Sequence, residues 1–153
     1  MADSEEFSQS VQDIEGDAWL AAVPEDTYLV RTVLRMRRVP IGELDIEGLR
    51  IMLSQNVGTT AILPRALDQL EANPLAAGHL YPGALLAAVL RLPEERWSDS
   101  AEVLAEVRGI AQRAEVMIAE MDGAQVSELR GLVLKFLSDR SEVDPGRTQP
   151  TRA

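Results

Sequence analysis

Apolar residues recur at helical spacing along most of this chain, and the stretch 41–92 alone holds three predicted helices. The first begins at Asp45, whose side chain is placed to cap the turn that follows. Its apolar positions lie three and four residues apart: Ile46, Leu49, Met52 and Leu53. The second is predicted over 58–72, begun or bent near Pro64, because proline lacks an amide proton. The third spans 84–90 and is almost wholly apolar, which indicates burial on most sides.

A fourth helix is predicted before this stretch, over 25–38. It begins at the acids that follow Pro24, because proline and acids favour a helix N-terminus. Its inward face is expected to carry Leu29, Val33 and Met36. The opposite side carries what we call the basic stripe: Arg31, Arg35 and Arg38. We expect this stripe to be a solvated face or a clamp for the acidic N-terminal segment, because no aromatic residue interleaves it as in a nucleic acid site.

Two long helices are predicted after the central stretch. Ser98 or Asp99 caps the first, which runs to Met121, and the second spans 124–139. Only Asp122-Gly123 connects them, and a loop that short forces the two helices into an antiparallel pair.

Together these helices predict an all-α fold, a single-domain irregular bundle of five to six helices that ends in a long antiparallel helical hairpin. The length of 153 residues fits one domain, and 4% of aromatic residues indicates a core of aliphatic side chains. Residues 1–24 are predicted to form an acidic, partly disordered strap, with Trp19 as an anchor into the core or a contact for a partner. The helical domain then spans 25–140, and 141–153 form a disordered tail.

The net charge is −10 and is placed unevenly. Residues 1–26 carry eight acids and no base, whereas 27–50 carry five arginines and three acids. An acidic surface repels nucleic acid and steers basic partners, although solubility alone is the simpler explanation. The absence of cysteine excludes disulfides and thiol catalysis. The N-terminus has neither the basic nor the apolar part of a signal peptide, so we expect a cytoplasmic protein that does not enter a membrane.

Candidate catalytic chemistry is sparse. His79 is the only histidine, and the sequence has no phosphate-binding glycine loop and no pair of histidines or cysteines to hold a metal. The adjacent acids Glu5-Glu6 and Glu94-Glu95 lie where nothing would raise a carboxyl pKa. We therefore expect a protein that is not an enzyme and has no catalytic, cofactor-binding or metal site.

Four segments resemble, in their order and spacing, the immunity proteins of bacterial contact-dependent growth inhibition (CDI) systems. They are TYLV at 27–30, DIEGLRIMLSQNVG at 45–58, NPLAAG at 73–78 and LYPGALLAAVLRLPEERW at 80–97. The resemblance covers 27–97, and the C-terminal helices match only in kind. The chain departs from the pattern where the family is expected to carry acids, at or near Ala77, His79 and Ala84. If those acids contact the toxin, this chain has a different partner or a different binding face.

This resemblance implies an immunity protein, monomeric before it binds, that forms a stoichiometric complex with the C-terminal domain of a cognate toxin. The toxin domain is expected to be basic and to be a nuclease, and no cofactor or direct nucleic acid contact is expected. Arg50 and Gln55 belong to the pattern and are expected to be structural. The candidate toxin contacts are Glu71, Asn73, His79, Tyr81, Glu94 and Glu95.

Two other functions stay open. One is a helical adaptor or regulatory binding protein without catalytic activity, which would need an exposed apolar surface. The other is an enzyme that uses carboxylates and His79, for which turnover would be lost in His79→Ala.

Overall fold

The computed structural model describes residues 7–20, 22–93, 95 and 100–141, and within these the chain forms seven α-helices, one 3-10 helix and no strand. In chain order they are α1 (Val11–Glu15), α2 (Tyr28–Met36), η1 (Ile41–Glu43), α3 (Ile46–Ser54), α4 (Thr59–Ala72), α5 (Ala84–Leu90), α6 (Ala101–Ile118) and α7 (Ala124–Ser141). The all-α prediction is confirmed, and the helix beyond the predicted count is α1, which lies in the strap. None of the described helices is both long and apolar enough to cross a membrane.

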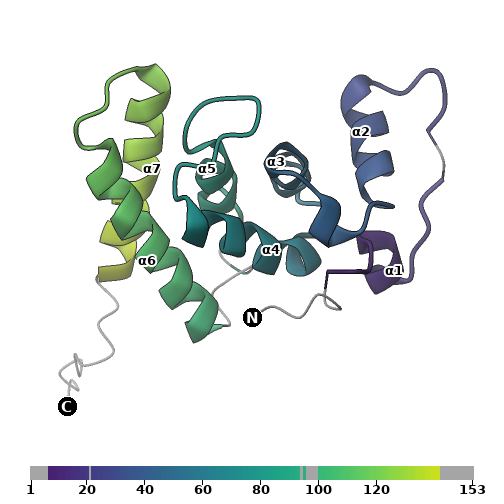
Figure 1. Cartoon of the computed structure of the whole chain (residues 1–153), viewed down its shortest axis with the longest axis horizontal. Helices are drawn as coiled ribbons and strands as arrows, with labels where there is room; N and C mark the ends of the chain where they lie inside the picture. The colour runs from purple at the N-terminus through teal and green to yellow at the C-terminus, as the bar shows by residue number, and fades with distance from the viewer. Residues whose placement is uncertain (1–6, 21, 94, 96–99, 142–153) are drawn as a thin grey trace, which may run out of the picture.

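The helices are arranged in two layers (Figure 1). One layer consists, in order, of α2, α3, α5 and α7, and the other of α1, α4 and α6. Within each layer, every helix contacts the next one. At the centre α3 packs against both α4 and α5, whereas α6 and α7 pair at one end as the predicted antiparallel hairpin. The two ends of the array therefore present different helices to a partner, α2 at one end and the hairpin at the other.

The core consists of aliphatic side chains, as the composition predicted. Every residue of α5 from Ala84 to Val89 is buried, which the apolar sequence of this helix indicated. The neighbouring helices contribute fully buried leucine, isoleucine and methionine side chains: Leu49, Met52, Ile62, Leu67, Leu70, Ile110 and Ile118. Removing such apolar surface from water is the main stabilising term of the fold, at roughly 25 cal/mol per Å².

The start of α2 differs from the prediction. The helix begins at Tyr28 because Thr27 caps it, its Oγ1 accepting a hydrogen bond from the Val30 amide at 3.2 Å. Asp26, which was expected in the first turn, instead accepts a hydrogen bond from the Val23 amide at 2.8 Å. The acids after Pro24 therefore form a turn before the helix and are not part of it.

Two further helices differ at their N-terminal ends. Ser100 caps α6, its Oγ accepting from the amide three residues later at 3.2 Å, whereas the predicted caps Ser98 and Asp99 lie outside the described residues. The helix α4 runs without interruption from Thr59, so Pro64 lies inside it and does not begin it.

The inward face of α2 is shorter than predicted. Met36, in the last turn, lies close to Gly48 of α3, and Val33 is buried. Leu29 was also expected to face inward, but it lies in the first turn, beyond this contact, and is exposed.

The clamp for the strap is Arg37, not the basic stripe. Its side chain is only 1% exposed, and its guanidinium donates hydrogen bonds to Glu15 Oε2 at 2.8 Å and to the Asp17 carbonyl at 2.6 Å. The ring of Trp19 covers the same guanidinium at 3.9 Å, so this tryptophan packs on Arg37 and remains partly exposed instead of entering the core.

The short helix α1 attaches the strap to the bundle. Val11 is fully buried against Gly58, which lies in the left-handed region (φ 62°) and where a Cβ would come within 2.6 Å of the valine Cγ1. Ser10 and Asp13 form a capping box at the start of the helix. The predicted disorder of the N-terminal segment and of the tail falls largely on 1–6 and 142–153, which lie outside the described residues.

Candidate functional site

The loop between α4 and α5, residues 73–83, is closed at its base by hydrogen bonds. Asn73 Oδ1 accepts from the Leu75 amide at 3.0 Å, and its carbonyl accepts from the Ala76 amide at 3.1 Å. The Gly83 amide donates to the Leu75 carbonyl at 3.0 Å. These bonds bring the two ends of the loop together, so that residues 77–82 form a projecting tip.

The tip of this loop is attached to the first turns of α3. The His79 amide donates to Glu47 Oε2 at 3.1 Å, and Gly78 (φ 66°) approaches so closely that a Cβ would lie 2.7 Å from the same oxygen. Arg50 binds both oxygens of Glu47, donating from Nε to Oε2 at 3.1 Å and from Nη2 to Oε1. The side chain of Glu47 is 13% exposed and that of Arg50 is 19% exposed. The hydrogen bonds from Arg50, followed by that from the His79 amide, hold the pKa of Glu47 below its ordinary value, so the carboxylate stays charged.

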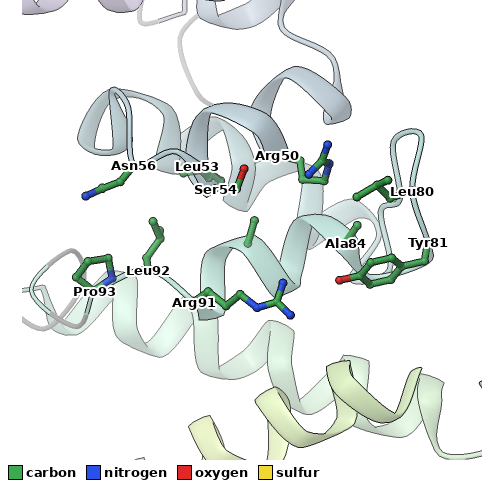
Figure 2. Close-up of a pocket in the computed structure, with 11 residues that line it drawn as sticks. Arg50, Leu53, Ser54, Asn56, Leu80, Tyr81, Ala84, Arg91, Leu92 and Pro93 are labelled. Carbon is green, nitrogen blue, oxygen red and sulfur yellow. The ribbon is translucent and has the colours of Figure 1, made fainter. Parts of the chain in front are cut away.

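A groove of about 200 Å³ lies between α3 and α5, beside this tip (Figure 2). Figure 2 shows Arg50 on one wall and Arg91 on the other, with Leu80 and Tyr81 at one end and Pro93 at the opposite end. The remaining lining residues are Leu53, Ser54, Asn56, Ala84, Ala88 and Leu92. We call this the α3–α5 groove.

The α3–α5 groove suits binding more than catalysis. Its lining is largely apolar, Leu80 is half-exposed at its mouth, and the two arginines are already paired, Arg50 with Glu47 and Arg91 with Glu128. None of the described lining residues is an acid or a histidine, so neither a carboxylate nor an imidazole faces the groove. In the part of the chain that the structure describes, no group of three or more His, Asp or Glu residues is placed to hold a metal ion.

Three carboxylates gather where α4 meets α6, and we call them the acidic cluster: Asp68, Glu71 and Glu106. Burial raises the pKa of Glu106, and the charges of Glu71 and then Asp68 raise it further. Arg113 offsets part of this charge, because its Nη1 donates to the Glu71 carbonyl at 2.9 Å and lies 3.4 Å from the Glu71 carboxylate. The cluster therefore keeps a negative field at the junction of the two helices.

The six predicted toxin contacts fall in separate places. His79 and Tyr81 share the loop tip, the first with its side chain exposed and the second lining the α3–α5 groove. Glu71 belongs to the acidic cluster, and Asn73 follows at the end of the same helix. Glu95 is exposed beyond the Pro93 end of the groove, and Glu94 lies outside the described residues.

Other parts of these two surfaces were not predicted from the sequence. Asp68 lies three residues before Glu71 and so shares its helix face, a spacing that was visible in the sequence. Glu106 joins them through a contact between helices, which no spacing reveals. Arg50 lies in the network that fixes the loop, and Gln55 ends α3 with its side chain exposed.

Comparison with protein families matches residues 13–107, more than half of the chain, to the CDI immunity proteins. The match includes α2 to α5, the loop 73–83, the α3–α5 groove and the acidic cluster, whereas α7 lies outside it. A comparison with curated proteins gave no match. The chain belongs to the family of CDI immunity proteins, whose members neutralise a toxin.

Proposed function

We propose that this immunity protein neutralises a nuclease toxin by forming a one-to-one complex with the basic C-terminal domain of that toxin. The observation that carries the proposal is the acidic cluster on α4 and α6. Burial, and then the charges of Glu71 and Asp68, raise the pKa of Glu106, so the charged form of Glu106 is disfavoured in the free protein. A cationic partner placed over the cluster would stabilise that charged form.

A nuclease is the toxin whose chemistry fits this field best. Its cleft must be basic to hold the phosphates of RNA or DNA, and an inhibitor with a net charge of −10 competes for the same field. Complementary charge also speeds association, which matters for a protein that must reach its toxin before the toxin reaches nucleic acid.

The neutral contacts would come from the loop tip and the α3–α5 groove. Tyr81 and the half-exposed Leu80 present an aromatic and an aliphatic side chain on a loop that Glu47 already fixes. Anchors of this kind carry much of the energy of protein interfaces, because they bind without first having to be ordered. The proposed contacts are those predicted from the sequence: Glu71, Asn73, His79, Tyr81, Glu94 and Glu95.

The test is co-expression of this chain with the C-terminal domain of a large toxin encoded beside it, followed by growth measurement, pull-down and nuclease assays. Purified toxin domain should degrade RNA or DNA, and one equivalent of this chain should stop the degradation. Growth rescue and a stable complex with a toxin that leaves both nucleic acids intact would refute the nuclease proposal. An absence of rescue together with an absence of complex would refute toxin binding and favour the adaptor alternative.

Charge variants locate the contact within the same assay. Replacing Glu71 and Glu106 with glutamine removes two charges of the acidic cluster while keeping side-chain size, and we expect slower association and a weaker dependence on salt. The matched control replaces Glu115 and Glu120, exposed acids near the other end of α6, with glutamine. Equal effects of both pairs would show that net charge, and not the cluster, governs binding.

A further inference from the structure

The outer face of α2 and the turn that follows it carry three arginines that no carboxylate neutralises within the described residues. Arg31, Arg35 and Arg38 are all exposed, and none takes part in an ion pair there. Among the described residues their side chains form one hydrogen bond, from Arg31 Nη2 to the Pro24 carbonyl at 2.5 Å. Three neighbouring cations without counterions are unusual in a chain whose net charge is −10.

The acidic strap runs beside this stripe without neutralising it. Glu15 pairs with Arg37, which is on another side of the helix. The Asp17 carboxylate accepts from Trp19 Nε1 at 3.3 Å, and Asp26 accepts from a backbone amide of the strap. These three acids have partners elsewhere, and Glu25 forms no ion pair with the stripe. Among the described residues, the stripe therefore remains available to a carboxylate from outside.

A cavity of about 360 Å³ lies between the strap and the basic stripe. It is lined by Ala22 from the strap and by Leu34 and Val39 from α2 and the residues after it, together with the three arginines. An apolar lining edged by cations fits a segment that has both an apolar side chain and carboxylates. We call this the α2 cavity.

Exposed apolar side chains are frequent in the segment 14–30, which leads into and overlaps the residues that line the cavity. Of the eleven large apolar side chains that are exposed in the described residues, seven lie between Ile14 and Val30. Leu20 is 89% exposed, Tyr28 is 79% exposed, and Val23 is half-exposed. Exposed apolar side chains in the segment that leads into the basic stripe, together with arginines that form no ion pair among the described residues, are characteristic of a binding surface.

We propose that the α2 cavity and the basic stripe dock an acidic, amphipathic segment of the toxin. This proposal rests on the proposed function, and charge complementarity chooses the occupant. Arginines spaced along one helix face require carboxylates opposite them, and the apolar lining requires an aliphatic or aromatic side chain between those carboxylates. A nucleic acid would meet an apolar lining and an acidic protein, and both disfavour its phosphates.

Two oppositely charged surfaces would orient the toxin. The basic stripe lies on α2 at one end of the array, and the acidic cluster lies where α4 meets α6, toward the other end (Figure 1). A toxin with its basic cleft over the cluster and an acidic segment over α2 has only one favourable orientation. A toxin with another charge pattern would place like charges together, which costs affinity and so provides specificity.

The test titrates the neighbouring toxin domain with the full chain and its variants by isothermal calorimetry, at low and high salt. Replacing Arg31, Arg35 and Arg38 together with glutamine should lower the affinity about tenfold or more and should flatten the salt dependence. Leu20→Ser should lower the affinity by about tenfold, because the leucine would no longer be buried against the toxin. The replacement should not affect folding, because Leu20 is 89% exposed in the free protein. The matched controls are Arg108→Gln with Lys135→Gln, and Val116→Ser at a position that is 76% exposed; both should leave the affinity unchanged.

The outcomes separate this proposal from the proposed function. If the wild-type chain forms no complex with the toxin, both fail. If it forms one that the arginine and Leu20 variants match in affinity and salt dependence, only the docking surface is refuted. Binding of a short single-stranded RNA that the triple arginine variant loses would make the stripe a nucleic acid site instead. A wild-type dimer that the triple variant loses in sedimentation would make it a contact between two copies of this chain.

Discussion

Replacing Arg50 with alanine should detach the loop tip from α3, because this arginine is the cation that holds Glu47 in place. The variant loses two hydrogen bonds to a carboxylate that is itself only 13% exposed. Among the described residues, that carboxylate then keeps the His79 amide as its one hydrogen-bond partner. Breaking a buried pair on one side costs about 3–5 kcal/mol, and the partial exposure here lowers our expectation to about 2–4 kcal/mol. For a chain of this length that corresponds to a fall in Tm of roughly 5–15 °C.

The pH dependence of stability provides a second measurement on the same variant. The pKa of Glu47 is lowered in the folded state, so this carboxylate stabilises the fold above its unfolded pKa, and that contribution is lost as pH falls through the folded pKa. In Arg50→Ala most of this acid-dependent loss should disappear, because the first cause of the lowered pKa is gone.

Urea unfolding across the acid range, followed by circular dichroism, would measure both effects. The double variant Glu47→Gln with Arg50→Gln is the control, because it removes the charges together and should cost less than the two single changes summed. If Arg50→Ala lowers the free energy of unfolding by less than about 0.5 kcal/mol and leaves the pH dependence of stability unchanged, the Glu47–Arg50 pair is no more than an ordinary surface ion pair.

Three shorter predictions concern other parts of the fold. Gly78→Ala should lower the free energy of unfolding by about 1–3 kcal/mol, because the φ of Gly78 is 66° and a Cβ would crowd Glu47. Its control in urea unfolding is Gly131→Ala, which has open space around it and should be neutral or stabilising. Arg37→Met should lower the free energy of unfolding by about 1–3 kcal/mol and speed amide hydrogen exchange in the strap, because it removes the hydrogen bonds to Glu15 and Asp17. Arg38→Met, at the exposed neighbouring position, should change neither the stability nor the exchange. Glu106→Gln should raise the stability of the free protein at neutral pH by up to about 1 kcal/mol, because the fold disfavours its charge, and a loss of stability would contradict that.

The helices were predictable where local chemistry decides them. Asp45 was expected to cap α3, and its Oδ1 accepts from the Gly48 amide at 2.7 Å. The helix α5 has the predicted bounds because seven apolar residues lie between a glycine and a helix-ending Leu-Pro pair. The start of α2 was not predictable in this way, since Thr27 and Asp26 are both acceptable caps and only the path of the chain selects one.

The candidate site was predictable only in part, because its pieces meet through tertiary contacts. Arg35, Arg37 and Arg38 are close together in sequence, and a small change in helix rotation decides which of them is buried. Spacing predicted that the stripe is either a solvated face or a clamp for the strap; the three arginines are exposed, and the clamp is Arg37. The acidic cluster likewise depends on a contact between α4 and α6 that links residues far apart in the chain.

Burial divides the arginines of this protein into two sets with different consequences. Arg37 and Arg50 are enclosed, bind carboxylates and fix the strap and the loop before any partner arrives, which spares the complex the cost of ordering them. The basic stripe is exposed and forms no ion pair within the described residues, so a change there alters the surface charge more than the packing of the fold. An immunity protein that must keep its fold while following changes in a toxin needs this division. We therefore expect partner choice to change through exposed positions such as the stripe and the acidic cluster, while the enclosed ion pairs stay fixed.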